Sequence, residues 1–491
     1  MKKHFIYIII FFVSAFQLKA QEALTGLKQN SQIKELHSKN TENKSLISKG
    51  KSQKTILELP FVDDFSKSVG YPDSSLWTND YVFVNLTYAN DPISIGVATF
   101  DAINEKGKIH DNASSFAFSA DTLTSQQINL DYPDDNTIFL SFYFQPGGLG
   151  DTPETKDSLV MEFLSADTTW TKKWQAVFNA NDSVLTETYF HNDTTTKTNN
   201  GDTIIDLKKE FQQVIFPVDE SIFLHGHFQF RFRNYASLSS GSNIESRVSN
   251  SDHWHIDFLI LDKDRNANDT IIDDIAFSKP MSSLLKNYES IPWTHYNRAL
   301  AYEMEDSISI TYRNLNDDIK NVDREFAIED LSGATGTYSF TGESGDNIPP
   351  FAEETYQRFI DYIFPYDPAT DSALFEIRSF FDLKSNIVAK PYRWNDTTRY
   401  LQKFYNYYAY DDGTAENGYG IIGEGTERAM VAMKFNTYKK DTLRAVQMFF
   451  NSVLDDANQT NTFRLHIWNE SSGEPGDIIY TLESLKPQNE D

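Results

Sequence analysis

The sequence predicts an all-β protein built from serial β-sandwiches. Aromatic residues make up 14% of the chain, with 37 Phe and 25 Tyr, and they recur in short runs where apolar and polar residues alternate. Clusters of Asn, Asp, Ser and Gly, which favour turns, separate these runs. A chain of 491 residues is too long for a single hydrophobic core, so we expect several domains.

The N-terminus predicts a secretory signal peptide over residues 1–20. Lys2 and Lys3 precede an apolar run that ends before Ala20, a small residue at the expected cleavage point. This run is too short to span a bilayer, and we expect no transmembrane segment. The mature protein is therefore expected outside the cell or on its outer surface, with the periplasm as the alternative.

Composition and turn signals divide the rest of the chain into four segments. The predicted segments are a flexible leader at 21–58, a first all-β domain at 59–280, an immunoglobulin-like sandwich at 281–400, and a jelly-roll-like β domain at 401–491. The last segment shows five predicted strands where a jelly roll has eight, so we expect it to be incomplete. Within the third segment, Tyr356, Phe359 and Ile360 at helical spacing predict a short helix at 352–363.

Two strongly alternating runs, 223–235 and 252–261, carry polar side chains on one face each. If the two strands lie side by side on a lectin-like sheet, their polar faces form a ligand-binding surface suited to sugars. The residues assigned to it are His227, Arg231, His255 and Asp257. Two alternatives remain open: zinc bound by the His225/His227 and His253/His255 pairs, or a solvated sheet face.

The acidic loop after the second run predicts a calcium site. Its candidate ligands are Asp262, Asp264, Asn266, Asn268 and Asp273. Oxygen side chains at alternate positions of a tight loop supply several of the six to eight ligands that calcium takes. Ala267 stands where a calcium loop has glycine, so an ordinary acidic surface loop is the alternative. Asp63 and Asp64 are expected nearby if the first and last strands of the domain are neighbours.

Three segments carry a resemblance to a known family. Phe61–Ser66 with Trp77, closed by Asp252–Asp257, resembles the concanavalin-like and MAM-like jelly rolls of large exported Bacteroidota proteins. Tyr410–Gly420 is similar to a segment that recurs in the same proteins. The resemblance implies a jelly roll at 59–280, an adhesin-like or scaffold-like role at the surface, and type IX secretion, with outer-membrane secretion components as partners.

Charge and cysteine content exclude several function classes. The formal net charge of −27 disfavours nucleic acid and anionic lipid as partners and favours cations such as calcium. The chain has no cysteine, which excludes disulfides and a thiol nucleophile.

The sequence also lacks the Gly-x-Ser-x-Gly and His-Glu-x-x-His motifs of common hydrolases. We therefore expect a non-catalytic exported surface protein that acts in binding, adhesion or scaffolding. Its expected partner is an extracellular polysaccharide or a cell-surface protein. The alternative is that these segments are accessory modules of a secreted polysaccharide-degrading hydrolase whose catalytic domain lies outside this chain.

Overall fold

The predicted all-β class is confirmed: 43% of the residues are in strands and 7% in helices. The computed structural model describes residues 21–46, 56–190, 196–200, 210–238, 250–332, 338–362, 364–382, 393–422, 426–451 and 461–487. The signal peptide predicted at residues 1–20 lies outside the described residues.

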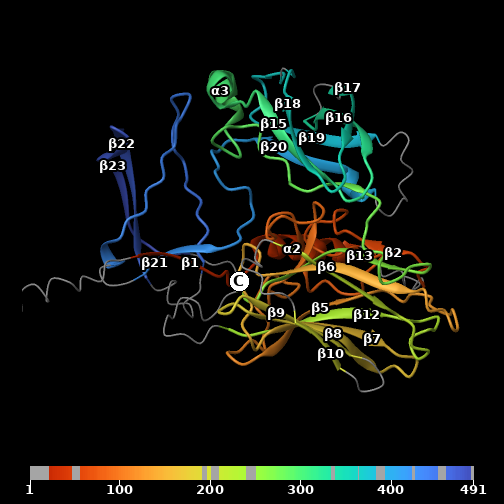
Figure 1. The fold of residues 1–491 in the computed structure, drawn as a ribbon. Coiled ribbons are helices and arrows are strands. Elements are labelled where there is room, and N and C mark those ends of the chain that lie inside the picture. Colours follow the sequence, from red (N-terminus) through yellow and green to blue (C-terminus); the bar gives the residue numbers. More distant parts are fainter. Residues whose placement is uncertain are drawn as a thin grey trace, which may run out of the picture.

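Residues 61–262 form a sandwich of two six-stranded sheets (Figure 1). The first sheet has the order β10-β9-β8-β7-β12-β5, and the second has the order β11-β6-β13-β4-β3, with β2 paired to β13. The strands are β2 (Phe61–Asp63), β3 (Phe83–Asn85), β4 (Val97–Phe100), β5 (Phe118–Thr124), β6 (Phe139–Pro146), β7 (Ser158–Leu164), β8 (Trp170–Asn179), β9 (Val184–Phe190), β10 (Thr196–Asn200), β11 (Gln212–Pro217), β12 (Phe230–Ala236) and β13 (Trp254–Asp262).

Aromatic side chains from both sheets fill the space between them. Phe142 of β6 lies edge-on to Trp174 of β8 at 5.1 Å between ring centroids, and to Phe232 of β12 at 4.9 Å. All three side chains are fully buried. Edge-to-face rings add a favourable electrostatic term to the large apolar area that they bury. This aromatic core replaces the disulfides that the chain cannot form.

A β-bulge in β13 changes which of its side chains face the core. The pairing with β6 shifts between Asp257 and Ile260, and Phe258 has a φ of 46°. Trp254 therefore faces the sandwich core, whereas Phe258 and Ile260 belong to a separate apolar cluster outside it. The predicted single apolar face for this strand is thus wrong beyond Asp257, because a bulge inserts one residue and reverses the alternation.

A second sandwich follows, with a three-stranded sheet (β14-β15-β18) and a four-stranded sheet (β17-β16-β19-β20). Its elements are β14 (Ile275–Phe277), η2 (Trp293–His295), α3 (Tyr296–Glu303), β15 (Ser307–Asn314), β16 (Lys320–Asp330), β17 (Tyr338–Ile348), β18 (Glu353–Phe359), β19 (Ala373–Asp382), η4 (Trp394–Asp396) and β20 (Thr397–Phe404). Phe277 stacks on Phe381 across the two sheets at 4.2 Å.

Two sequence predictions for this sandwich are wrong. The predicted helix at 352–363 is strand β18, which pairs with β15 along its whole length. The predicted boundary at residue 400 falls inside β20, whose partner is β19, so the sandwich extends to Phe404. Both errors have the same cause: pairing with strands that are distant in the sequence determines these elements. The spacing of residues within a short segment does not reveal such pairing.

The segment predicted as a flexible leader contains ordered structure. Strand β1 (Gln21–Thr25) pairs with β21 (Gly418–Ile422), and helix α2 (Ser31–Leu46) follows it. Ile33 of this helix is buried in a cluster with Phe83 and Tyr88 of the first sandwich. The prediction of a flexible leader is therefore wrong for residues 21–40, which use their few apolar side chains to pack against the first sandwich.

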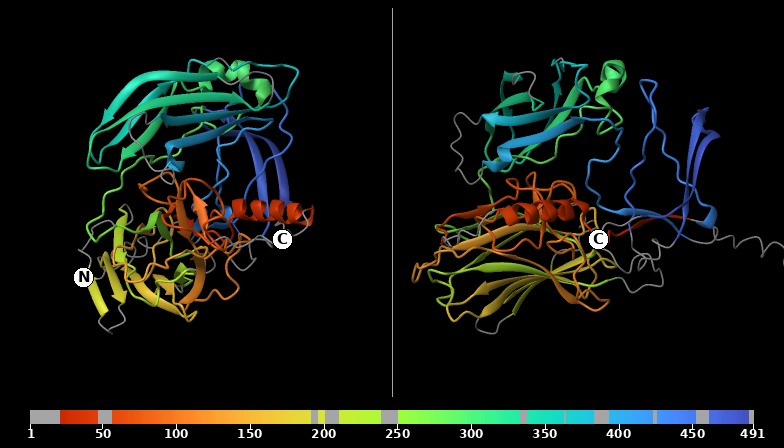
Figure 2. Two further views of the ribbon diagram at one scale, coloured as in Figure 1. Left: turned by 90° about the vertical axis from the view of Figure 1, so that its right-hand side faces the viewer. Right: turned by 180° about the vertical axis from the view of Figure 1, so that it is seen from behind.

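The C-terminal segment does not assemble the predicted jelly roll. Its elements are β21, η5 (Thr426–Arg428), β22 (Phe463–Ser471) and β23 (Glu474–Leu485). Two of the five strands expected in this segment, at 428–436 and 441–451, have no strand structure, and among the described residues β22 and β23 pair only with each other. This ribbon stands apart from the second sandwich (Figure 2). Within the described residues, no helix is long and apolar enough to cross a membrane.

The aromatic core gives a direct stability test. We expect Phe142→Ala to lower the free energy of unfolding of the first sandwich by about 3–5 kcal/mol, because it leaves a cavity between two close-packed sheets. Phe116→Ala is the matched control, since that ring is 81% exposed. Denaturant unfolding of both variants measures the difference, and equal stability would contradict the described core.

Candidate functional site

The predicted calcium loop is organised around an arginine. The Arg265 side chain, only 9% exposed, pairs with Asp269 at 2.5 Å and donates to the carbonyl oxygens of Phe139 and Ile260 and to Ser141 Oγ at 2.9 Å. The loop therefore closes on a guanidinium, which fulfils the role that a cation would have and repels a second positive charge.

The five predicted calcium ligands are not brought together. Asp273 instead forms an ion pair with Lys320 and accepts a hydrogen bond from the Asn316 side chain at 2.9 Å. Asn266 accepts a hydrogen bond from the backbone of Asn268 at 2.9 Å, and Asp262 accepts one from Lys263. The backbone of Asp264 adopts a left-handed conformation, with a φ of 60°. This arrangement does not favour one calcium site from Asp262, Asp264, Asn266, Asn268 and Asp273, and that site stays a prediction.

The predicted ligand-binding set is split between the two sheets. Arg231 is in β12 of the first sheet, and His227 is exposed in the turn before that strand. His255 and Asp257 are in β13 of the second sheet, and both are fully buried. The two polar runs are therefore not neighbours, and the hypothesis of one surface or one zinc site that joins them is wrong.

The first sheet presents a polar outer face that contains Arg231. Its guanidinium lies 4.1 Å from the ring centroid of Trp170 and pairs with Glu162 at 2.6 Å. Arg233 lies on the same face and donates to Ser119 Oγ at 2.8 Å. This sheet is on the side away from the second sandwich in Figure 1. The face combines an aromatic ring with fixed hydrogen-bonding groups.

Two buried histidines, His253 directly before β13 and His255 within it, contact a glycine-rich loop. His255 contacts Thr99 Oγ1 at 2.9 Å and the carbonyl oxygen of Gly147 at 3.2 Å, and His253 Nδ1 accepts from the backbone of Asp151 at 2.9 Å. A Cβ at Gly148 would lie 2.4 Å from the His255 ring, and φ there is 58°. Only glycine fits this close approach. Burial lowers the pKa of His253 to about 4 and that of His255 to about 3.

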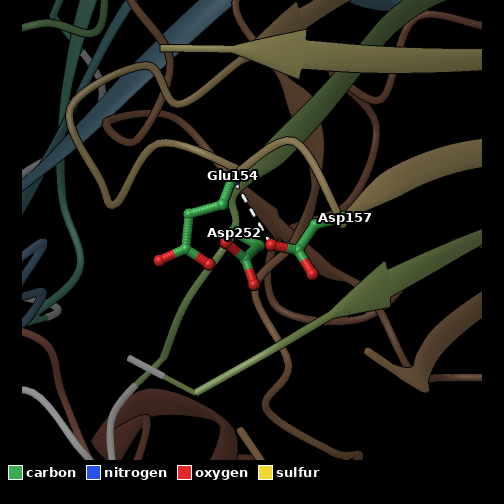
Figure 3. A group of neighbouring side chains, drawn as sticks. All are labelled: Glu154, Asp157 and Asp252. Carbon is green, nitrogen blue, oxygen red and sulfur yellow. Dashed lines mark hydrogen bonds between the residues drawn. The ribbon is translucent and has the colours of Figure 1, made fainter. Parts of the chain in front are cut away.

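The same loop leads to a cluster of three carboxylates, which we call the edge triad: Glu154, Asp157 and Asp252. Ligand oxygens of the three side chains all lie within 4.8 Å of one another (Figure 3). Asp157 directly precedes β7 and Asp252 comes two residues before β13, so the triad joins the two sheets at one edge of the sandwich. Ser237, which follows β12, donates from Oγ to Asp157 at 3.0 Å and from its backbone to Asp252 at 2.6 Å.

The edge triad has the electrostatics of a cation site. Asp157 and Asp252 are fully buried, and one oxygen of each has no hydrogen-bond partner. Burial and then the charge of Asp157 raise the pKa of Asp252, and burial raises the pKa of Asp157 to about 7. Buried like charges favour a proton or a cation between them. Sequence reasoning missed the triad because its members come from distant segments with no common spacing.

Comparisons with known proteins leave the family open. No family model matches the chain, and no curated protein matches it. Among solved structures, a β-glucanase from Bacillus licheniformis is 10% identical, with 43% of this chain and all of that chain covered and a TM-score of 0.23. A laminarinase from a Flavobacterium species is 9% identical, covering 41% of this chain and 99% of that chain, with a TM-score of 0.23.

A third solved structure, a β-galacturonidase from Eisenbergiella tayi, is 9% identical, with 66% of this chain and 43% of that chain covered and a TM-score of 0.22. Identities and scores this low establish neither a shared fold nor a shared activity. The predicted membership among exported Bacteroidota surface proteins stays a prediction.

Histidine protonation tests the burial described above. At pH 5.5 we expect the rings of His253 and His255 to stay neutral, because burial disfavours the imidazolium. Burial acts to lower the pKa of His110, but the hydrogen bond with Asp121 at 2.7 Å and the charges of nearby carboxylates together outweigh burial and raise that pKa. At that pH we therefore expect His110 to be protonated. Nitrogen chemical shifts of the histidine rings report both states, and protonated rings at His253 and His255 would contradict their placement.

Proposed function

We propose that this chain is a non-catalytic exported protein that binds an extracellular polysaccharide through the outer face of its first sheet. The observation that supports this most is the group of Arg231, Trp170 and Glu162 on that face. An aromatic ring can stack on a sugar, and a guanidinium and a carboxylate can bind its hydroxyl groups. The salt bridge and the ring contact fix the arginine before a ligand arrives, which lowers the entropic cost of binding.

Packing supports the choice of this face over the other sheet. The outer side of β13 is buried: Phe258 and Ile260 pack in an apolar cluster that Leu315 of the second sandwich joins. A sugar therefore has no access there. The alternating exposure along β12 leaves Arg231 and Arg233 reachable while Phe230 and Phe232 stay in the core.

We also propose a structural calcium ion at the edge triad. The burial of Asp157 and Asp252 favours a stabilising role, because a polysaccharide substrate cannot reach carboxylates without exposed surface. Calcium prefers oxygen ligands, and the triad offers two buried oxygens without partners plus the Glu154 carboxylate. This arrangement accords with a binding protein and does not provide an exposed acid and base pair.

The polysaccharide proposal is tested by substitution on the sheet face. We expect Arg231→Ala to weaken binding to an immobilised polysaccharide panel at least about tenfold, because a pre-ordered charged group on the face is lost. Affinity electrophoresis against laminarin, lichenan and polygalacturonate measures it. Arg399→Ala is the matched control, since Arg399 is an exposed strand arginine paired with Glu376 in the second sandwich. Equal retardation of the two variants would contradict the assigned face, and no retardation of the unaltered chain would contradict a ligand within this panel.

Calcium binding at the edge triad is tested by melting temperature. We expect calcium to raise the Tm of the unaltered chain relative to chelator, because a ligand of the folded state stabilises it by mass action. In the double variant Asp157→Asn/Asp252→Asn, the calcium-dependent rise assigned to the triad should be lost. A rise unchanged by this variant would place the responsible ion elsewhere.

A further inference from the structure

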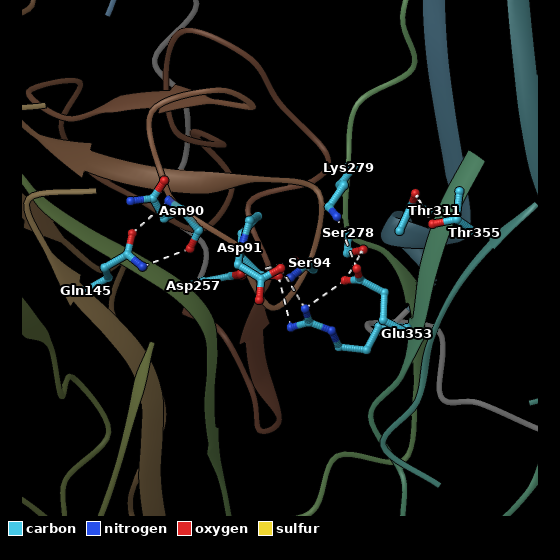
Figure 4. Close-up of polar contacts among 12 residues, drawn as sticks. Asn90, Asp91, Ser94, Gln145, Asp257, Ser278, Lys279, Thr311, Glu353 and Thr355 are labelled. Atoms are coloured by element: carbon cyan, nitrogen blue, oxygen red, sulfur yellow. Dashed lines mark hydrogen bonds and ion pairs between the residues drawn. The ribbon is translucent and has the colours of Figure 1, made fainter. Parts of the chain in front are cut away.

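The two sandwiches form a common frame for the C-terminal segment. Asp91 of the first sandwich and Glu353 of the second lie close together (Figure 4), and Arg313 pairs with these carboxylates at 2.9 and 2.8 Å, respectively. Ile95 of the first sandwich is buried in the apolar core of the second. The sandwiches therefore share a packed junction, and a segment attached to this frame is held in a defined position.

Two stretches of the C-terminal segment, 428–436 and 441–451, belong to no sheet, and we call them the arms. They are long uncoiled stretches, drawn in blue in Figure 1. Within the described part of the chain, residues 430–433 and 443–450 form no backbone–backbone hydrogen bond. Unpaired backbone donors and acceptors along an exposed stretch are a template for another strand.

The arms are attached to the body of the protein at both ends. At the tip between them, His295 of η2 contacts a carboxylate oxygen of Asp441 at 3.0 Å. At the base, the first arm follows β21, which is paired with β1. The second arm ends at Asn451, whose side chain donates to the carbonyl oxygen of Gly26 at 2.6 Å. The backbone between these anchors is therefore positioned to accept a strand.

The arms and strand β23 expose apolar side chains that a folded protein normally buries. Examples on the arms are Val431, Met433, Leu443 and Val446, and examples on β23 are Ile478 and Ile479. Each of these side chains is at least 45% exposed. A single exposed apolar side chain is ordinary, but many gathered on one segment mark a contact surface.

Strand β23 has a free edge that the chain's own arms do not use. It pairs with β22 along one edge, and its other edge has no partner among the described residues. The ribbon does touch the arms: Phe463 packs on Phe450 at 5.0 Å between ring centroids, and Glu470 lies 4.0 Å from Lys434. Both contacts come from β22, so the free edge of β23 is left for a second molecule.

Charge indicates which partner fits the arms. Residues 426–451 contain five basic and two acidic residues, although the chain as a whole has a net charge of −27. Strand β23 contains three acidic residues and no basic one. The arms of two copies would therefore repel each other, whereas the arms and β23 attract each other. The complement of the arms is an acidic, apolar strand with a free edge, and β23 of a second copy has all three properties.

We infer that two copies of this chain associate by reciprocal strand exchange, in which β23 of each copy adds to the arms of the other. The two contacts are equivalent under a two-fold axis, so the assembly closes as a dimer. Backbone hydrogen bonds supply the pairing, and the exposed apolar side chains leave water as the strands meet. The exchange goes beyond the proposed function and depends on neither polysaccharide binding nor the edge triad.

Sedimentation equilibrium of the full chain tests this inference. We expect a monomer–dimer equilibrium for the unaltered chain. Ile479→Lys should raise the dimer dissociation constant at least about tenfold, because a charged side chain on an apolar edge opposes strand pairing. Ile319→Lys is the matched control and should leave the constant unchanged, since both isoleucines are 65% exposed and Ile319 lies in the loop between β15 and β16. A monomeric unaltered chain, or equal constants for the two variants, would overturn the inference.

A mixing experiment keeps the test valid if Ile479→Lys disturbs its own ribbon. Val431→Glu places an acidic side chain on the first arm, and we expect it to weaken association as Ile479→Lys does. Each variant lacks a different half of the contact, so an equimolar mixture should recover dimers with one intact contact. This recovery needs only the arms of the Ile479→Lys chain. A mixture that associates no better than either variant alone would overturn the inference, whereas loss of polysaccharide binding alone would leave it intact.

Discussion

The burial of β13 on both faces is the constraint on which the rest of this structure depends. The strand pairs with β2, β4 and β6. It sends apolar side chains to the sandwich core on both sides of its bulge, and the bulge turns Phe258 and Ile260 to the cluster that Leu315 of the second sandwich joins. The outer side of β13 must be shielded from water, and the second sandwich provides part of that shield through Leu315. The covered sheet cannot also be an open binding face, so recognition is left to the sheet that contains β12.

The same constraint explains where the carboxylates lie. Chain segments that enter or leave a fully buried strand must pass from a polar to an apolar environment, and Asp252 stands at one such point before β13. Asp64 stands at the corresponding point after β2, which pairs with β13 at Leu259. Buried carboxylates at strand ends are costly alone, and for the edge triad the proposed calcium ion would offset that cost. In a chain without cysteine, such an ion would take the place of a disulfide.

The sequence predicted the fold class and the strand alternation of β12 well, because these depend on local patterns. It did not predict the bulge in β13, the strand β18 or the docking of residues 21–40, which depend on partners distant in the sequence. For the site, Arg231 lies on the polar outer face of its sheet, but His255 and Asp257, which were predicted beside it, are buried in the other sheet. Asp64 was expected near the acidic loop, but the hydrogen bond from Asn395 to Asp274 could not be predicted, since no local spacing connects these two residues. Arg265, inside the predicted loop, was decisive and was overlooked.

The two sandwiches share a packed junction, and we expect them to unfold as one cooperative body. Differential scanning calorimetry of the full chain in calcium tests it most directly. We expect residues 61–404 to unfold in a single transition whose calorimetric and van't Hoff enthalpies agree. Two well-separated transitions under that condition, one for each sandwich, would contradict the shared core and the sealed face of β13.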